Sequence, residues 1–525
     1  MVRHPSAVLM AGLLALVAGC SSPTTTQGSP NAGKTLIVEQ EFSNYDSLDP
    51  GRGVFPVPVL VDHNVYDSLL TINPHDLSKP YPSLAKSYSV STDASTFTFH
   101  LRDGLKFANG DPLTSADVVW SLTRLKNINS AASNVMVGLT ASALDQSTIT
   151  VSSATPNPGV PILLTQTNAA ILDSKLVQQN GGTTDSKDQA DSYLNAQSAG
   201  TGPYMVGSAD RTSQIVLKVN PHYWGAKPTY STVIIRNVPA SSQALDVQDG
   251  QAQLAINVPQ QVASTLTSSS SVNVVRAASE DQFQLNMSAD PAVSPLTANP
   301  DFRDAVRYAL DYKGFVALAG AGAVQSSGFI PIGILGSLPA SQIPVRDLAR
   351  ARADLAKVGV ANPTMDLYYI SNNTNAGISL AQMGTKIQSD LSQVGITVNL
   401  IGRPDAVWAG VVNPGKAASF ILTEPADYPD PTDFLTNVAG PSGAKARKRL
   451  HWTIGMDTTF DALITKATSA VTPTERNADY AAVVSAANAK AYQVYVLQAG
   501  RLLVEAKSVG ASINPFDYVD LASVT

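Results

Sequence analysis

Residues 96–118 read TFTFHLRDGLKFANGDPLTSADV and contain the clearest secondary-structure signals of the chain. Its first six residues alternate Thr or His with Phe or Leu, the pattern of a β-strand with one buried face. Asn109-Gly110-Asp111-Pro112 is turn-forming, and Thr114 with Asp117 three residues later indicates the start of an α-helix. The stretch therefore predicts a strand, a turn and a helix in direct succession.

Strands and helices are predicted to alternate on both sides of this stretch. Alternating apolar residues predict strands at 35–42, 215–219, 232–238 and 396–401. Apolar residues three and four apart predict helices at 58–70, 241–249, 301–310 and 381–394, the last ending at Gly395. The apolar run Phe315 to Leu338 is broken by glycines and Pro331, so we interpret it as a buried helix end and a loop. This order predicts an α/β protein.

Length and composition exclude several classes of protein. The chain has 525 residues, and single cores stop growing beyond about 250–300 residues, so we expect more than one lobe. A hydrophobic share of 44% and a charged share of 14% exclude both a disordered chain and a membrane bundle. The formal net charge is −6, and the one dense basic run is Lys445 to Arg449. We therefore expect no nucleic-acid partner.

The N-terminus has the pattern of an export signal. A basic start is followed by the apolar run Ala7 to Val17, which is too short for a stable transmembrane helix. Cys20, the single cysteine, follows the small residues Ala18 and Gly19, and this arrangement resembles the lipobox of bacterial lipoproteins. The resemblance implies that residues 1–19 are removed and that Cys20 is lipidated. Residues 20–34 then form a flexible tether; a buried, inert cysteine is the alternative.

Two motifs of enzymes occur without their required context. Gly28 to Thr35 matches the P-loop pattern, but a strand pattern follows it where a helix is needed. Ser83-Leu84-Ala85-Lys86 matches S-x-x-K, yet the chain has no Lys-Thr-Gly. The six histidines lack the spacing of metal ligands. We expect no catalytic residues, no cofactor and no metal site, and a cell-envelope serine hydrolase using Ser83 and Lys86 is the alternative of another class.

The order of segments resembles the extracytoplasmic solute-binding proteins of ABC importers, in the oligopeptide, dipeptide and nickel family. The resemblance covers nearly the whole mature chain. It rests on residues 82–85 and 97–118, with shorter matches at Gly200–Tyr204, Tyr223–Gly225, Phe302–Asp311 and Ala426–Pro431. It implies a two-lobed periplasmic-binding-protein-like fold of type II, joined by a hinge, with an extra subdomain inserted in lobe I.

The resemblance also implies how the chain is divided. Lobe I is expected to take residues 35–68, 195–275 and 496–525. The inserted subdomain takes residues 69–194, and lobe II takes residues 276–495. The chain then crosses between the lobes more than once, which suits a hinge that closes reproducibly.

Three residues are implied as ligand-binding. Asp427 matches the acid that pairs with the α-ammonium of a peptide in peptide-binding members, and a purely turn-forming role is its alternative. Glu424 stands where family members usually have Trp, so we expect a more cationic ligand or an altered pocket. Trp408 matches an aromatic position often near the cleft, and a place in the core is its alternative.

Other residues of the matching segments are interpreted as structural. Tyr223 and Trp224 are expected to pack one lobe. Arg303 and Arg307 lie one helical turn apart, and we expect them on a solvated helix face. Asp103, Asp111 and Asp117 are expected to be helix caps and turn formers.

The function implied is that of a substrate-binding lipoprotein on the outer face of the plasma membrane. It would capture short peptides, or a similar cationic small solute, and deliver them to permease subunits and their ATPase. We expect a monomer that moves from open to closed lobes when ligand favours the closed state. A nickel chelate, haem or another non-peptide solute is the alternative within the family, and a sensory or adhesion lipoprotein is the alternative outside transport.

Overall fold

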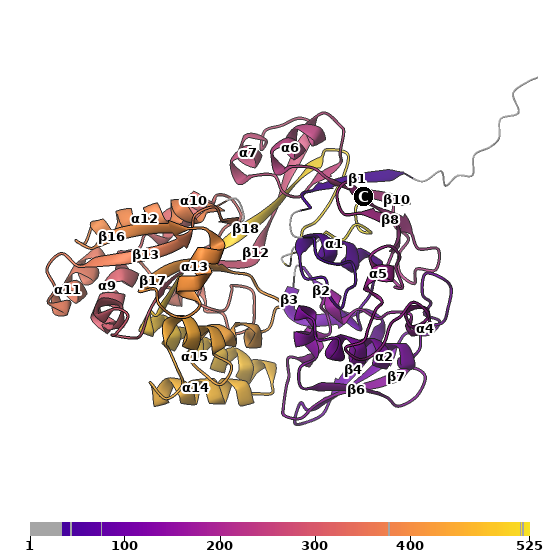
Figure 1. The fold of residues 1–525 in the computed structure, drawn as a ribbon, viewed down its shortest axis with the longest axis horizontal. Coiled ribbons are helices and arrows are strands. Elements are labelled where there is room, and N and C mark those ends of the chain that lie inside the picture. The colour runs from indigo at the N-terminus through magenta and orange to yellow at the C-terminus, as the bar shows by residue number, and fades with distance from the viewer. Residues whose placement is uncertain (1–33, 43–44, 75, 376–377, 515, 517–518) are drawn as a thin grey trace, which may run out of the picture.

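The computed structural model describes residues 34–42, 45–74, 76–375, 378–514, 516 and 519–525 (Figure 1). Two bodies lie side by side, and the long strands β12 (Val272–Met287) and β18 (Gln493–Ala506) run between them at the top of the view. The body containing the N-terminal half is lobe I with its subdomain, and the other body is lobe II. No helix in the described part of the chain is long and apolar enough to cross a membrane.

One ten-stranded sheet extends through both lobes. Its order is β16-β13-β17-β12-β18-β11-β1-β10-β9-β8. The strands on the lobe I side are β1 (Thr35–Gln40), β8 (Tyr204–Asp210), β9 (Gln214–Val219), β10 (Thr232–Asn237) and β11 (Leu254–Ala255). Those on the lobe II side are β13 (Thr364–Ile370), β16 (Thr397–Arg403) and β17 (Ser419–Glu424). The chain is therefore mixed α/β, as predicted.

Lobe I packs helices against its part of the sheet. These are α1 (Pro56–Val65), α4 (Ser174–Gln179) and α5 (Asp191–Leu194), with α6 (Ala240–Gln248) and α7 (Gln260–Thr265) covering the sheet near the joint. The C-terminal residues Val519, Leu521 and Val524 pack into the same core. Ala170 and Leu194, which lie within the range expected for the inserted subdomain, also pack into this core. The domain limits themselves stay a prediction.

A smaller body with its own core, the inserted body, contains residues 96–118. Its four-stranded sheet has the order β4 (Ala85–Val90), β5 (Thr96–Leu101), β7 (Thr148–Ser153), β6 (Leu139–Ala143). Helix α2 (Ser115–Asn127) packs on it, and α3 (Val160–Leu163) and the hairpin of β2 (Leu70–Asn73) and β3 (Asp76–Pro82) complete it. The predicted strand 96–101 has its predicted bounds. Asp117 accepts a hydrogen bond from the Thr114 N–H, so its predicted capping role is confirmed.

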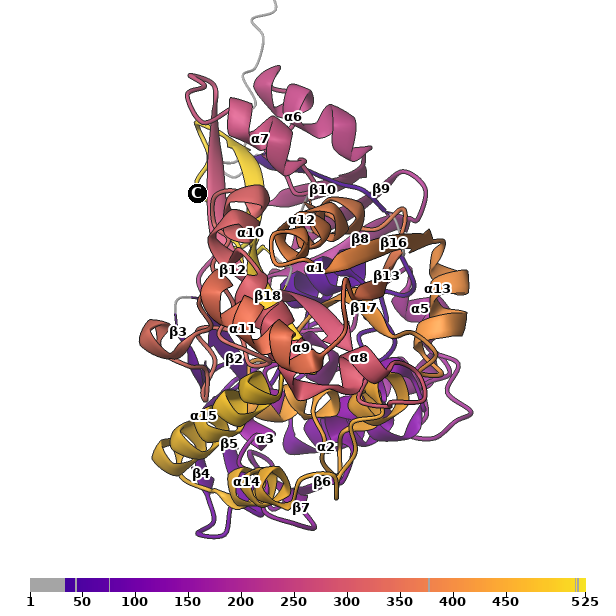
Figure 2. The same ribbon diagram turned by 90° about the vertical axis from the view of Figure 1, so that its left-hand side faces the viewer.

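Lobe II covers both faces of its sheet with helices. They are α8 (Pro295–Ala298), α9 (Pro300–Ala309), α10 (Tyr312–Ala319), α11 (Leu348–Val358), α12 (Leu380–Ser392), α13 (Asp405–Val412), α14 (Thr458–Ser469) and α15 (Pro473–Lys490). Figure 2 faces the outer side of this lobe, with α9 and α11 in front, α14 below and α6 and α7 above. After α10 the chain runs as a loop to residue 339, as predicted.

The prediction of a solvated face for Arg303 and Arg307 is wrong. Arg303 is 4% exposed and donates to the carbonyls of Thr297, Ala298 and Lys490. Arg307 donates to the carbonyl of Asn488 at 3.0 Å. Helix α9 packs on the C-terminal end of α15, so these guanidinium groups bind carbonyl oxygens that the helix ends leave free.

The joint between the lobes is marked by a break in the β12–β18 ladder. The pairing shifts between Ala278 and Gln282, where a bulge interrupts it. Val272, before the bulge, packs under α6 and α7, whereas Phe283, after it, lies in the lobe II core. At Gly500 a Cβ atom would lie 2.6 Å from the carbonyl carbon of Gly322, so only glycine allows this close crossing.

Candidate functional site

A stripe of buried polar side chains crosses one face of the lobe II sheet. Successive side chains of a strand point to opposite faces, so on β12 the amides alternate with Phe283, Leu285 and Met287, which enter the core. Buried amides on a central strand are uncommon and mark a site where polar groups are needed. The stripe, named here the polar stripe, consists of Gln282, Gln284 and Asn286 on β12, Gln493 and Tyr495 on β18, and Glu424 on β17.

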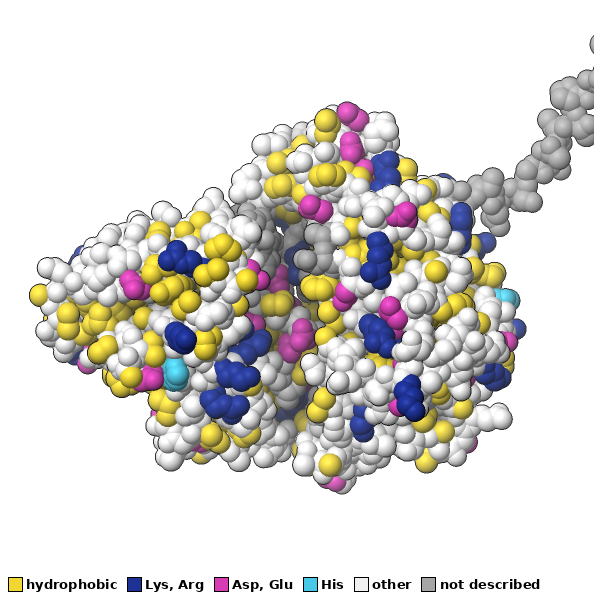
Figure 3. Space-filling view, in the orientation of Figure 1, with side chains coloured by type: hydrophobic (Ala, Val, Ile, Leu, Met, Phe, Trp, Pro, Cys, Tyr) yellow, Lys and Arg dark blue, Asp and Glu magenta, His cyan; other side chains and the backbone are white. Residues whose placement is uncertain are grey.

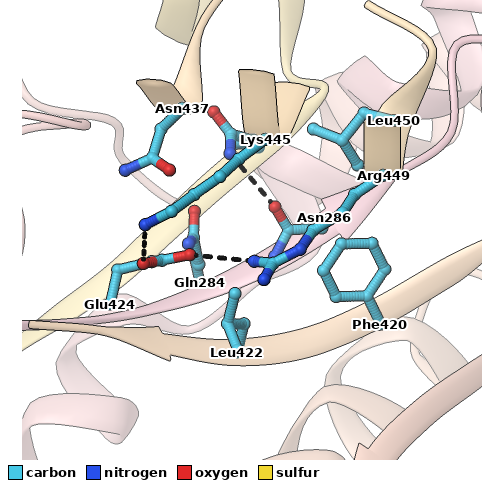
Figure 4. Close-up of a pocket in the computed structure, with 10 residues that line it drawn as sticks. Gln284, Asn286, Phe420, Leu422, Glu424, Asn437, Lys445, Arg449 and Leu450 are labelled. Carbon is cyan, nitrogen blue, oxygen red and sulfur yellow. Dashed lines mark hydrogen bonds and ion pairs between the residues drawn. The ribbon is translucent and has the colours of Figure 1, made fainter. Parts of the chain in front are cut away.

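Two cations from a separate segment contact this stripe. The short helix η5 (Ala446–Leu450) and the residue before it place Lys445 and Arg449 over Glu424 (Figure 4). Lys445 Nζ lies 2.7 Å from Glu424 Oε2, and Arg449 Nη1 lies 3.1 Å from Glu424 Oε1. Each oxygen of this buried carboxylate is thus paired with one cation, a charge-assisted arrangement.

The cavity at this point is small. Four members of the polar stripe line it, namely Gln284, Asn286, Glu424 and Gln493, together with Phe420, Leu422, Leu450, Asn437 and the two cations. About 10 Å³ is open to a water-sized sphere, which is the space of one water molecule. Gln284 Oε1, Asn286 Nδ2 and Tyr495 OH are buried and have no hydrogen-bond partner among the described residues. A peptide does not fit inside the cavity, so a larger ligand has to lie on its open side.

Asp427 lies three residues beyond the end of β17 and is close enough to Lys445 and Glu424 for their charges to act on it. Its side chain is exposed, and its backbone N–H donates to Asp433 Oδ2 at 2.8 Å. The surrounding protein displaces water and raises the pKa of Asp427; Lys445 opposes this shift and Glu424 adds to it. Desolvation and the nearby Asp427 raise the pKa of Asp433 to about 8. Asp427 and Asp433 are therefore neighbouring acids that both hold their protons more tightly than ordinary carboxyl groups do.

The loop that holds Asp427 also touches the inserted body. Tyr428 packs against the core of that body. Asp430 is bound by Arg476 at 2.8 and 2.9 Å, and a Cβ atom on Gly159 of the inserted body would lie 3.3 Å from the Asp430 carboxyl. Figure 3 shows a groove between the two bodies, with acidic side chains along it and Lys and Arg side chains gathered on lobe II beside it. Asp427 is thus carried by a loop that spans this groove.

Trp408 lies in the lobe II core. It is 3% exposed and packs edge to face on Phe420, with ring centroids 5.9 Å apart and an interplanar angle of 80°. Since Phe420 lines the cavity, Trp408 supports the wall of the site from behind. A direct contact between Trp408 and ligand stays a prediction.

The other predicted residues have structural partners of their own. Lys86 pairs with Asp103 at 3.2 Å, and the Ser83 carbonyl accepts from Arg102. Trp224 Nε1 donates to Asp67 at 2.8 Å, consistent with its expected packing role. Cys20 and most of the P-loop-like motif lie outside the described residues. No group of three or more potential metal ligands occurs in the part of the chain that the structure describes.

Sequence reasoning missed the polar stripe and its two cations. The signal was present, because residues 282–287 read QFQLNM, a strict alternation of amides with apolar residues. From the sequence alone, the basic run at 445–449 bears only on nucleic-acid binding. Its spacing of four residues between Lys445 and Arg449 places both on one side of a helical turn.

Comparison with known proteins identifies the family. Residues 79–446 match the description "Bacterial extracellular solute-binding proteins, family 5 Middle". A probable D,D-dipeptide-binding periplasmic protein of Escherichia coli K12 is 28% identical over 516 residues, covering 96% of each chain. A glutathione-binding protein of the same strain is 26% identical over 404 residues, covering 75% of this chain and 72% of its own.

Solved structures share the fold. A periplasmic binding protein from Helicobacter pylori, in complex with the peptide STSA, superposes with a TM-score of 0.70 at 21% identity, covering 94% of this chain and 98% of its own. The two-lobed type II architecture, the sequence match over most of the chain and the groove between the lobes all point to the same family. The chain belongs to the bacterial extracellular solute-binding proteins of family 5, which serve transporters as substrate-binding components and are not enzymes.

Proposed function

We propose that this protein captures short peptides with a free α-ammonium outside the membrane and delivers them to an ABC permease and its ATPase. The observation that carries the proposal is Asp427, an exposed carboxylate on a loop between two bodies that a hinge joins. A groove that excludes water strengthens a charge-assisted bond between this carboxylate and an ammonium. The names of two relatives, which specify a dipeptide and glutathione, support a peptide as the ligand.

Closure of the lobes would complete the site. A ligand shifts the open and closed populations only by its difference in affinity for the two states. Asp427 sits where lobe II meets the inserted body, so a ligand bound to it touches both sides in the closed state. No chemical step is required.

The protein is proposed to act as a monomer tethered to the outer face of the plasma membrane through Cys20. One acyl chain binds membranes only marginally, so stable anchoring needs more than one. Replacing Cys20 with Ser in the full-length gene should release the protein from the membrane fraction and abolish incorporation of a labelled fatty acid. Membrane retention of the Cys20→Ser protein would contradict this tether.

The ligand class is tested by what the protein carries when purified. Full-length protein with Cys20→Ser is denatured, and the released small molecules are identified by mass spectrometry. We expect a set of short peptides, lost from Asp427→Asn and retained by Asp405→Asn, a matched change of an exposed acid on α13. A single non-peptide species, such as a metal chelate or haem, would overturn the proposal, as would peptides retained by Asp427→Asn.

A further inference from the structure

We infer that Lys445 and Arg449, positioned by Glu424, form a second subsite that takes a carboxylate of the ligand beside the ammonium held by Asp427. This inference rests on the proposed function and narrows it. The preferred ligand is a dipeptide-sized zwitterion whose two charges lie close together, and not a cation.

The first step is the charge balance of the cluster. Glu424 is buried and both of its oxygens are already paired, at 2.7 Å by Lys445 and at 3.1 Å by Arg449. It therefore offers no free negative charge to a cationic ligand. Asp427 and its neighbour Asp433 are the other acids near Lys445. A ligand with one ammonium and one carboxylate leaves the net charge of this group unchanged, whereas a cation changes it.

The second step is the number of unused donors. The Lys445 ammonium has three N–H groups, and Arg449 has five. Among the described residues, Lys445 donates only to Glu424, and Arg449 donates only to Glu424 and, through Nε, to Asn413. The side chains of Lys445 and Arg449 are 42% and 22% exposed, whereas that of Glu424 is 10% exposed. The unused donors are thus the part of the cluster that a ligand can reach.

The third step is the position of Lys445. Its charge acts on both Glu424 and Asp427, and it opposes the rise in the pKa of Asp427 that desolvation causes. An ammonium bound to Asp427 therefore comes close to the Lys445 ammonium, and like charges repel. A carboxylate on the same ligand removes this repulsion by accepting from Lys445 and Arg449. A ligand with an ammonium alone gains no such compensation.

The fourth step is preorganisation. Lys and Arg side chains lose rotamer entropy when a ligand fixes them, which weakens binding. Here Glu424 has already fixed both side chains through one hydrogen bond each. Since the cavity beneath them holds about one water molecule, the ligand carboxylate has to sit on their groove side.

The test is a calorimetric titration of the full-length Cys20→Ser protein, freed of co-purified ligand by unfolding and refolding. The probes are alanyl-alanine in its L,L and D,D forms, its C-terminal amide, and the amide of alanyl-glutamate. We expect the better of the two dipeptides to bind at least tenfold more tightly than its amide. Tight binding of the alanyl-glutamate amide would assign the carboxylate to a side chain, and weak binding would assign it to the C-terminus.

Variants distinguish a loss of carboxylate recognition at this subsite from a general loss of ligand binding. Lys445→Met and Arg449→Met should each weaken dipeptide binding at least tenfold and leave binding of the amide unchanged or improved. Lys445→Arg should keep the preference, and Lys448→Met, an exposed neighbour in the same segment, should change neither affinity. Equal affinity of dipeptide and amide for the unmodified site, or equal loss of both in Lys445→Met, would overturn the subsite while leaving peptide capture intact. Failure of every dipeptide to bind would overturn the proposed function and the subsite together.

Discussion

Two charge clusters of this molecule have opposite arrangements. In lobe I, Arg124 lies between Asp49 and Asp188 and binds both, with distances of 2.6 to 2.9 Å. In lobe II, Glu424 lies between Lys445 and Arg449. The Arg124 side chain is 1% exposed and all its guanidinium nitrogens are used, whereas the lobe II cations keep donors free at the surface. A cluster with no unused donor stabilises the fold, and one with unused donors can bind a ligand.

The lobe I cluster also connects parts that are distant in sequence. Arg124 belongs to α2 of the inserted body, Asp49 to the loop after β1, and Asp188 to the segment before α5. Its partners raise the pKa of Arg124, while Arg124 lowers the pKa of Asp188 despite burial. This cluster therefore holds the inserted body on lobe I.

Breaking the lobe I cluster should have the largest effect. Arg124→Met leaves the buried carboxylates Asp49 and Asp188 with only the partly exposed Arg52 as a cation, at 3.2 and 3.0 Å. Removing the buried partner of such a cluster typically costs about 3–5 kcal/mol. We expect that loss in the free energy of unfolding measured with urea. Arg403→Met, at an exposed position in lobe II, should change it by less than about 0.5 kcal/mol. Similar values for the two variants would remove the distinction between the clusters.

A third charge cluster lies at the joint between the lobes, and its contribution to stability should depend on pH. Glu280 lies in the bulge of β12, where burial and the neighbouring Asp281 raise its pKa to about 8, and Arg501 opposes this. A raised pKa in the folded state means that stability falls as pH rises from about 4 to 8. Glu280→Gln should match the original protein at pH 4 and exceed its stability by about 4 kcal/mol at pH 8.5. Thermal unfolding across this pH range measures the difference, and a pH-independent difference would contradict the assignment to Glu280.

Breaking the lobe II cluster at its centre should have a smaller effect. Glu424→Gln leaves Lys445 and Arg449 close together without a full counter-charge, but both reach solvent. We expect a loss of about 1–2 kcal/mol in unfolding free energy. Added salt should recover part of the loss, because it screens the repulsion of the two cations. An unfolding free energy that is lower by the same amount at all salt concentrations would show that charge is not the cause.

The smallest effect on stability is expected when Lys445, the exposed partner of Glu424, is replaced. Lys445→Met removes a half-exposed ion pair, which contributes about 1 kcal/mol or less. The same change from a cation to Met thus costs several kcal/mol at position 124 and little at position 445. Unfolding curves of Arg124→Met and Lys445→Met measured together test this ranking. If Lys445→Met proved as unstable as Arg124→Met, the lobe II cluster would have to be counted as structural.

Local patterns in the sequence predicted much of the fold. The strand at 96–101 and the helix after Thr114 follow from spacing alone, and most other helices differ from prediction by one or two residues at their ends. The helix expected at 58–70 ends at Val65, because the chain has to turn into β2 at Leu70. Periodicity identifies a buried face but not the element that covers it.

The site was harder to predict because it is built from distant segments. Asp427 and Glu424 came from the resemblance to a family, but Lys445 and Arg449 reach Glu424 only through the packing of η5 on β17. The burial of Arg303 depends on the end of α15, 187 residues away. Charged residues cannot be classed as solvated or paired until such long-range contacts are known.

The alternation along β12 limits how this lineage can change its ligand. The amides at 284 and 286 line the site and the neighbouring apolar residues face the core, so inserting or deleting one residue would exchange the two sets. Substitutions at the even-numbered positions leave the register intact. Relatives that diverge in specificity are therefore expected to vary side chains along this strand while keeping its length, so that gaps in an alignment fall outside residues 282–287.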